Sequence, residues 1–127
     1  MNLLIDTHVA LWMYSSPERL GPSTRTALVG RGNFVYVSAV SVWEVEIKRA
    51  IGKLVAPSGF AELCRSRGFD ELPITFEHAE AAGQLPAHHH DPFDRMLIGQ
   101  AVVEDLRVVT ADSVFASYGI ATFDPSM

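Results

Sequence analysis

The sequence contains little that would suit a secreted, membrane-spanning or strongly basic protein. Cys64 is the only cysteine among 127 residues, which rules out an internal disulfide and leads us to expect a protein of the reducing cytoplasm. The longest unbroken apolar run covers residues 9–14, far short of the roughly 20 residues that a membrane-spanning helix needs. Only 10 lysines and arginines stand against 15 acidic residues, so the formal net charge is -5. Long-range attraction therefore cannot recruit a nucleic acid by itself, and metal ions or local basic side chains would have to offset the repulsion.

What is present is the composition of an ordinary globular domain. Hydrophobic residues make up 48% of the chain and charged residues 20%, which excludes the disordered and fibrous classes. A length of 127 residues suits one domain, which we expect to span residues 1–127. We find no internal repeat, low-complexity segment or linker that would divide it.

Apolar patterning along the chain alternates between short strand-like segments and helical periodicity. Residues 34–37 are β-branched and aromatic, whereas Val40, Trp43 and Ile47 recur at three- and four-residue steps before Gly52. We expect strands at residues 1–5, 34–37, 72–75, 107–110 and 120–123, and helices at residues 7–14, 22–29, 38–52, 60–68, 76–85, 92–104 and 112–118. Strands joined by helical crossovers predict an α/β fold, a three-layer sandwich with a central parallel sheet flanked by helices.

Acidic residues stand where the predicted strands end and the predicted helices begin. Asp6 directly follows the first strand, and Asp112 comes two residues after the fourth. Glu44 and Asp94 lie in the first turns of predicted helices. Because the carboxyl ends of parallel strands meet at one edge of a sheet, where ligand sites form, we expect these four carboxylates to converge on one pocket.

Each of these acids also has a simpler explanation. Asp6 and Asp112 could be helix N-caps, each worth ~1 kcal/mol. Glu44 completes a capping-box pattern and is spaced from Lys48 as a surface ion pair worth ~0.3–0.5 kcal/mol, and Asp94 closes a similar pattern that begins at Asp91. Independent caps, however, have no reason to be carboxylates at every position, because serine, threonine and asparagine cap as well and do not repel one another. We therefore favour a functional acidic cluster.

Such a cluster favours a particular chemistry. Several carboxylates held within a few ångströms cannot all ionise cheaply unless a cation lies between them. Oxygen ligands without thiolate or converging imidazole select Mg²⁺ or Mn²⁺, and Mg²⁺ keeps several waters while taking one or two carboxylates directly. An ion of this kind activates water and neutralises the charge that grows on a phosphate, so the cluster suits phosphodiester hydrolysis.

Four segments around these acids resemble the PIN-domain ribonucleases, and within them the VapC-like toxins of type II toxin–antitoxin pairs. The segments are LLIDTHVALW, SAVSVWEVEIKRAIGKL, HHHDPFDRMLIGQA and VVTADSVFASYGI, and together they span nearly the whole chain. The resemblance implies a small PIN-like α/β sandwich that binds Mg²⁺ or Mn²⁺ and cleaves single-stranded RNA. It also implies a homodimer and a cognate antitoxin, whose basic segment would suit an acidic pocket.

The resemblance also implies roles for individual residues. Asp6 and Asp94 are expected as the principal metal ligands, and Glu44 and Asp112 as the remaining acids, acting directly or through bound water. Further contacts to the carboxylates, the metal waters or the substrate are expected from Thr7, Lys48, Asp91, Arg95 and Thr110. For Asp91 the main expectation is a cap that fixes its turn. For Lys48 and Arg95 the alternatives are phosphate contact, charge balance of the cluster, and plain surface ion pairing.

Other conspicuous residues are expected to be structural. The three histidines at residues 88–90 have no zinc-site spacing, so we expect a solvated or structural role, with RNA contact by one of them as the alternative. Trp43 is expected in the core, with a base-stacking platform as the alternative; Trp12 is likewise expected in the core, with partner contact as its alternative. Cys64 is expected as a small buried hydrophobic residue. Gly99 interrupts a predicted helix at a cost of up to ~1 kcal/mol.

The leading hypothesis is a Mg²⁺-dependent endoribonuclease toxin that leaves 5′-phosphate and 3′-hydroxyl ends. An alternative is a non-catalytic module whose acidic pocket binds a basic partner segment, which predicts tight partner binding without RNA turnover. A third hypothesis is a receiver-like or HAD-like phosphotransfer domain. That hypothesis is weaker because Thr7 and His8 follow Asp6 where a second acid would be expected.

Overall fold

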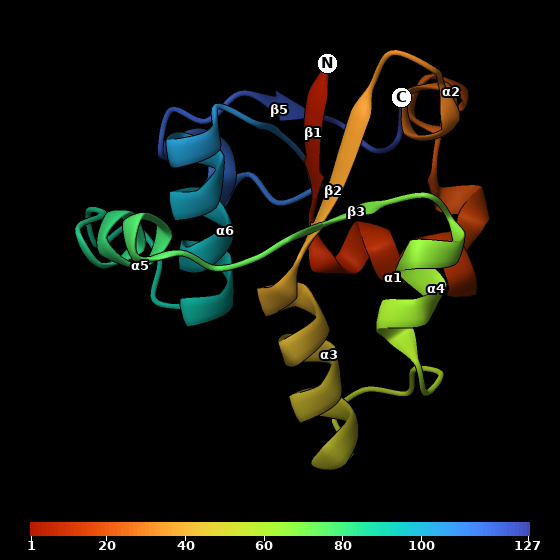
Figure 1. Cartoon of the computed structure of the whole chain (residues 1–127), viewed down its shortest axis with the longest axis horizontal. Coiled ribbons are helices and arrows are strands. Elements are labelled where there is room, and N and C mark those ends of the chain that lie inside the picture. Colours follow the sequence, from red (N-terminus) through yellow and green to blue (C-terminus); the bar gives the residue numbers. More distant parts are fainter.

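The sheet is parallel throughout, with the strand order β3-β2-β1-β4-β5. The structure is a computed structural model that describes all 127 residues (Figure 1). The strands are β1 (Asn2–Ile5), β2 (Phe34–Ser38), β3 (Asp70–Leu72), β4 (Arg107–Val109) and β5 (Thr122–Phe123). Each strand is followed by helical or looped chain that returns over a face of the sheet, as the sequence pattern predicts.

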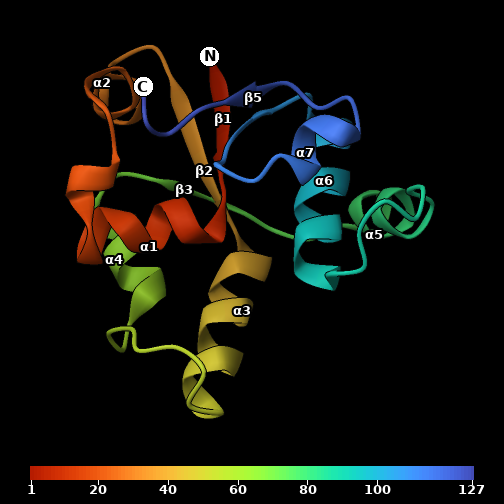
Figure 2. The same ribbon diagram turned by 180° about the vertical axis from the view of Figure 1, so that it is seen from behind.

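Helices cover both faces of this sheet, as Figures 1 and 2 show from opposite sides. The helices are α1 (Thr7–Ser15), α2 (Pro22–Val29), α3 (Ala39–Ala50), α4 (Phe60–Ser66), α5 (Phe76–Gly83), α6 (Pro92–Glu104) and α7 (Val114–Ser117), with a short 3-10 turn η1 (Pro17–Arg19). One face carries α1, α2 and α4, and the other carries α5, α6 and α7. The predicted three-layer α/β fold is thereby confirmed. None of the helices combines the length and the apolar character needed to cross a membrane.

The central strand β1 separates two hydrophobic cores. Leu3 and Ile5 point into the core on the α1, α2 and α4 side, whereas Leu4 points into the core beneath α6 and α7, and all three are fully buried. A strand buried on both faces is apolar at every position rather than at alternate ones, which explains the continuous run at the start of the chain. The hydrophobic effect of this burial fixes β1 at the centre of the sheet.

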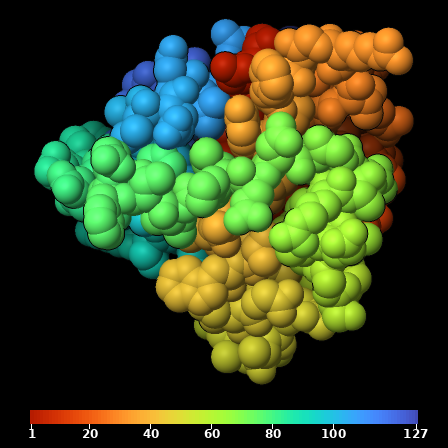
Figure 3. Space-filling view, viewed as in Figure 1, coloured from red at the N-terminus to blue at the C-terminus, as the bar shows by residue number.

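Strands β1 and β2 run downward in Figure 1 and end where α1 and α3 begin. There α1 begins one residue after β1, and α3 begins directly after β2 and projects away from the sheet (Figure 3). The backbone N–H of Asp6 donates to the carbonyl oxygen of Val109 at 3.0 Å, which joins the ends of β1 and β4. This edge is where the sequence predicts a site.

Two expectations about individual segments are wrong. The third strand covers Asp70–Leu72 rather than residues 72–75, because Pro73 has no N–H to donate to the ladder and Ile74 is exposed. Trp43, expected in the core, is 59% exposed. The buried face of α3 is formed by Val40, Ser41, Glu44 and Val45, and the helix extends beyond the sheet, so Trp43 belongs to neither hydrophobic core.

Smaller differences concern where elements begin and end. Helix α5 stops at Gly83, α7 covers only Val114–Ser117, and β5 only Thr122–Phe123. The predicted segments at residues 76–85, 112–118 and 120–123 were each longer. These are the ends at which helices fray and short strands lose pairing, and none of them moves a predicted site residue to another element.

Candidate metal centre

Asp6 anchors the site at the end of β1. Its carboxylate caps α1 by accepting a hydrogen bond from the backbone N–H of His8 at 3.0 Å. Its other oxygen accepts from the hydroxyl of Thr110, at the end of β4, at 2.7 Å. Burial alone would raise the pKa of Asp6, but the hydrogen bonds from His8 and Thr110 outweigh it and hold that pKa below its usual value. Asp6 is therefore both a cap and a buried anion.

Glu44 lies on the buried face of α3, with only 4% of its surface exposed. The ammonium of Lys48, one helical turn further on, lies 2.5 Å from Glu44 Oε2. This bond is the main reason that the pKa of Lys48 is raised, and the charges of Asp91 and Asp94 add to it. Lys48 therefore faces three carboxylates, and the predicted charge-balancing role is the one its position fits.

Asp94 lies in the first turn of α6, where Asp91 is the N-cap. The Asp91 carboxylate accepts from the backbone N–H groups of Phe93 and Asp94 at 2.8 and 3.3 Å, as expected for a residue that fixes this turn. The side chain of His89 lies with its Nε2 2.9 Å from Asp94 Oδ2. These contacts bring three potential ligands together at the start of one helix.

The electrostatics of Asp94 show which carboxylates share its surroundings. Burial, together with the charges of Asp91, Asp6 and Glu44, raises the pKa of Asp94 to about 6 against the hydrogen bond from His89. Asp6 and Glu44, which follow two different strands in the sequence, thus both repel Asp94 in the folded protein. Convergence of these carboxylates is the arrangement that a divalent cation stabilises.

Asp112 lies at the rim rather than in the buried part of this group. It is exposed, and its Oδ1 accepts from the backbone N–H of Val114 at 3.0 Å. It lines a pocket of about 210 Å³ together with Asp6, His8, Trp12 and Ala111. Asp112 therefore shares a pocket with Asp6.

The ligand atoms that lie closest together are not those of the four predicted acids. His89, Asp91 and Asp94 each offer one ligand atom within 4.8 Å of the other two. Carboxylate oxygens with a single imidazole suit a hard or borderline divalent cation, and the repulsion at Asp94 gives such a cation a reason to bind. The residues present therefore fit a divalent metal ion at this edge of the sheet.

Thr7 and Arg95 have partners other than the acids. Thr7 donates its hydroxyl to the Ser41 hydroxyl at 2.8 Å, which ties the start of α1 to α3. Arg95 forms no ion pair; its guanidinium donates to the carbonyl oxygens of Ala82, Leu85, Pro86 and His89 at 3.0–3.2 Å. Of the alternatives for Arg95, surface ion pairing is absent from the structure, because these carbonyls already occupy its donors, and the bonds hold the loop that carries His89.

Sequence reasoning gave no site role to His8 and only a general one to the histidines at residues 88–90. His8 Nδ1 lies 3.6 Å from Asp6 Oδ1, and this contact raises the pKa of His8. The signal that could have singled out His8 is its place two residues after a predicted strand-end acid. For His89 no such signal exists, because a loop has no periodicity that tells which of three consecutive side chains turns inward.

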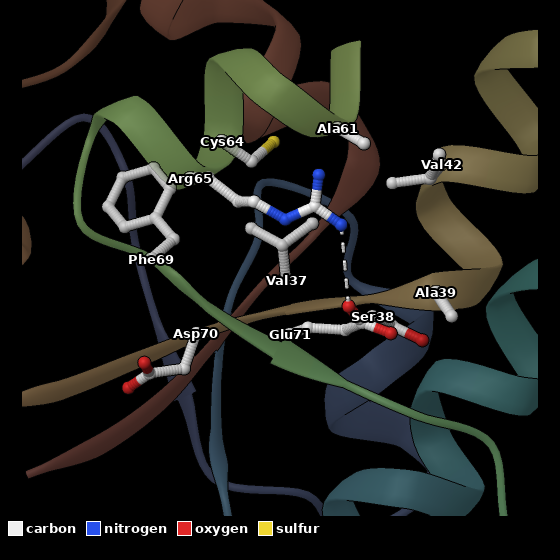
Figure 4. A pocket seen from close by; sticks show the side chains of 10 residues that line it. All are labelled: Val37, Ser38, Ala39, Val42, Ala61, Cys64, Arg65, Phe69, Asp70 and Glu71. Atoms are coloured by element: carbon white, nitrogen blue, oxygen red, sulfur yellow. Dashed lines mark ion pairs between the residues drawn. The ribbon is translucent and has the colours of Figure 1, made fainter. Parts of the chain in front are cut away.

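A separate cavity of about 170 Å³ lies between α3, α4 and the β2–β3 side of the sheet (Figure 4). Its walls are mostly apolar, and its charged members include Arg65 and Glu71, which lie 3.7 Å apart as an ion pair. Cys64 lines it, and burial raises the pKa of this thiol to about 11, so the thiolate is scarce near neutral pH. The expectation of a small, buried, unreactive cysteine is consistent with this position. None of the acids of the metal centre lines the cavity.

Comparison with known proteins identifies the family of this chain. The profile of the PIN domain matches residues 3–121. The chain belongs to the PIN-domain family. The resemblance seen in the sequence is confirmed by a relative, "Ribonuclease VapC22" of Mycobacterium tuberculosis (strain ATCC 25618 / H37Rv), which is 31% identical over 125 residues and is covered, like this chain, to 92%.

Solved structures with the same fold include toxin–antitoxin complexes. DNA-bound VapBC from Salmonella typhimurium matches this PIN domain with a TM-score of 0.69 and 22% identity, covering 98% of each chain. VapBC-1 from nontypeable Haemophilus influenzae matches with a TM-score of 0.69 and 12% identity over 100% of both chains. At these identities the two structures establish the fold of this PIN domain.

Proposed function

We propose that this PIN domain is a Mg²⁺-dependent endoribonuclease toxin of a type II toxin–antitoxin module, and that it hydrolyses single-stranded RNA. The observation that carries the proposal is the gathering of Asp6, Asp91 and Glu44 around Asp94, whose pKa is raised to about 6 by its burial and by the charges of these acids. Such a group of carboxylates is costly to the fold, and a divalent cation offsets that cost. The similarity to a ribonuclease of the same family supports RNA as the substrate.

In this proposal Asp6 and Asp94 are the principal ligands, and Glu44 and Asp112 are the remaining acids. A bound Mg²⁺ or Mn²⁺ would lower the pKa of an attacking water and neutralise charge on the phosphate and leaving oxygen. Thr110 holds the Asp6 carboxylate in one orientation through its 2.7 Å hydrogen bond. Asp91 fixes the first turn of α6 and with it the position of Asp94.

Lys48 has a separate part in the proposal. In the metal-free chain its ammonium neutralises Glu44 and lies near Asp91 and Asp94. A cationic side chain thus already occupies part of the acidic pocket. An antitoxin with a basic inhibitory segment would use the same complementarity, and the solved complexes of similar fold support such a partner. A homodimer that acts in the cytoplasm completes the proposal.

The decisive test compares Asp6→Asn and Asp94→Asn with the parent chain on single-stranded RNA, with and without Mg²⁺. The cleavage rate of both variants should fall by at least about a hundredfold, as expected when a group that stabilises the transition state is removed. Asp70→Asn is the matched control, because Asp70 is an exposed acid on β3 outside the site.

The product ends provide an independent check. Attack by water leaves 5′-phosphate and 3′-hydroxyl ends, whereas attack by the RNA 2′-hydroxyl leaves a 2′,3′-cyclic phosphate. Cyclic ends, or full activity in either Asn variant, would refute the proposed mechanism. Tight binding of an antitoxin without turnover of any RNA would favour the non-catalytic alternative, and stable phosphorylation of Asp6 would favour a phosphotransfer domain.

A further inference from the structure

Two aromatic side chains lie side by side at the border of the acidic group. Trp43 on α3 and Phe93 on α6 have ring centroids 5.4 Å apart and ring planes at 72°, an edge-to-face contact. Trp43 immediately precedes Glu44, and Phe93 immediately precedes Asp94. The same contact between the two helices therefore positions an aromatic pair and two of the candidate ligands.

The indole of Trp43 presents an exposed aromatic surface that neither hydrophobic core of the fold covers. Trp43 is 59% exposed, and its ring packs on Phe93 rather than on either hydrophobic core. An indole left in water forgoes the stabilisation that its large apolar area would gain on burial. Exposure at this position leaves the aromatic surface available to a ligand.

A positive charge lies beside the same pair. The ammonium of Lys48 is 5.8 Å from the centroid of the Phe93 ring and also bonds to Glu44. The neighbouring Arg49 is engaged elsewhere, with Glu46 and the carbonyl oxygen of Ala56. Lys48 is thus the basic group that links the aromatic pair to the carboxylates.

We propose that Trp43, held edge-to-face by Phe93, is the stacking platform for an unpaired nucleobase of the RNA next to the phosphate that is cleaved. The inference rests on the proposed function and adds the residues that hold the RNA strand. A flat aromatic surface with an adjacent cation is how proteins hold single-stranded nucleic acid, because every base has a π-face and every nucleotide a phosphate. Bases within a duplex already stack on one another, so the platform selects single strands.

The location favours a nucleobase over a protein side chain as the occupant. Trp43 and Phe93 are each one residue from a carboxylate of the proposed metal centre, so a base stacked there places its own phosphate near the acids. Lys48, whose ammonium is 5.8 Å from the centroid of the Phe93 ring, is the positive group beside the pair that a phosphate there would contact. A protein partner or a second copy of this chain is the outcome that the experiment below distinguishes.

The test measures binding of short oligoadenylate and oligouridylate to a chain that carries Asp94→Asn, which prevents cleavage. Adding Trp43→Ala should weaken binding roughly 5- to 150-fold, the loss that corresponds to ~1–3 kcal/mol of base stacking. Oligoadenylate should lose more than oligouridylate, because a purine has the larger stacking surface. Trp43→Phe should retain most of the affinity. Phe76→Ala on α5 is the control, since Phe76 is 86% exposed and is not a member of the pair.

Fluorescence provides a direct readout, since the chain has only two tryptophans. With Trp12→Phe also present, oligoadenylate should quench the emission of Trp43, which is then the single tryptophan of the chain. In the chain that keeps Asp94, Trp43→Ala should raise KM more than it lowers kcat, because the stacking interaction is equally strong in the ground state and in the transition state.

Each other outcome is decisive. Unchanged binding and cleavage in Trp43→Ala would overturn the platform and leave the nuclease proposal standing. Failure of the parent site to bind or cleave any RNA would overturn both. If Trp43→Ala instead converts a dimer to a monomer, or abolishes only antitoxin binding, with RNA affinity unchanged, the aromatic pair is a protein interface and the platform is wrong.

Discussion

Thr110 donates its hydroxyl to the carboxylate of Asp6 across 2.7 Å, joining the ends of two neighbouring strands. The same Thr110 oxygen accepts from the backbone N–H of Asp112 at 3.0 Å. One side chain therefore orients the buried acid at the end of β1 and fixes the turn that carries the exposed acid. Both acids depend on β4 pairing with β1 in the observed register.

Replacing Thr110 with valine should destabilise the protein at neutral pH by about 1–2 kcal/mol, since a charged buried acceptor loses its donor. The pKa of Asp6 lies below its usual value, so its ionised form contributes stability above the unfolded-state pKa, and this is lost as the pH falls through the folded-state pKa. The difference between Thr110→Val and the parent should therefore shrink in acid. Urea unfolding at several pH values measures it, with Thr110→Ser as the control. A difference that does not depend on pH would contradict this reasoning.

Replacing Asp94 with asparagine should stabilise the metal-free protein. The pKa of the Asp94 carboxyl group is raised to about 6. The stability that this group contributes to the folded state is therefore fully present below the unfolded-state pKa and is lost as the pH rises through about 6. Asparagine does not ionise and so avoids this loss of stability. We expect the free energy of unfolding to rise by on the order of 1–2 kcal/mol at neutral pH. Unfolding in the presence of a chelator measures the gain. Adding Mg²⁺ should stabilise the parent and not Asp94→Asn; equal stabilisation of both would count against Asp94 as a ligand.

Replacing Lys48 with methionine should have opposite effects on folding and on metal binding. Glu44 is 4% exposed and would lose its partner, which destabilises the metal-free chain. Because Lys48 is itself partly exposed, we expect a loss of about 1–2 kcal/mol, less than for a fully buried pair. Mn²⁺ should bind more tightly, because a competing cation is gone. Calorimetric titration with Mn²⁺ tests this, with Lys53→Met as the control; weaker Mn²⁺ binding would show that Lys48 organises the site.

Replacing Gly99 with alanine should destabilise the protein despite the better helix propensity of alanine. A Cβ at residue 99 would lie 2.8 Å from the backbone nitrogen of Ala82, so α5 and α6 would have to separate. We expect a net loss of about 1–3 kcal/mol, as for other overpacked sites. Gly83→Ala is the matched control, because a Cβ there meets nothing within 4 Å. Thermal unfolding of the two variants should give shifts of different size, and a more stable Gly99→Ala would show that the helices can move apart freely.

The sequence by itself determined the order of strands and helices and the placement of acids at their junctions. A short run such as Leu3 to Ile5 is apolar at every position, and only a central strand of a parallel sheet buries both of its faces in that way. Asp6 and Asp91 could also be read as caps, because a cap is a local interaction within a few residues of the chain. The predicted convergence of acids follows from the topology of parallel strands rather than from any contact between them.

The tertiary structure alone decided which of the remaining side chains meet. Periodicity indicates that Trp43 lies on an apolar stripe, but only the fold shows that α3 extends past the sheet and leaves Trp43 without a core to enter. His89 reaches Asp94 from an irregular loop whose carbonyl oxygens accept hydrogen bonds from Arg95, an arrangement that no periodic pattern in the sequence indicates. Local interactions depend on residues that are close in the sequence, whereas contacts between distant elements depend on how the whole chain packs.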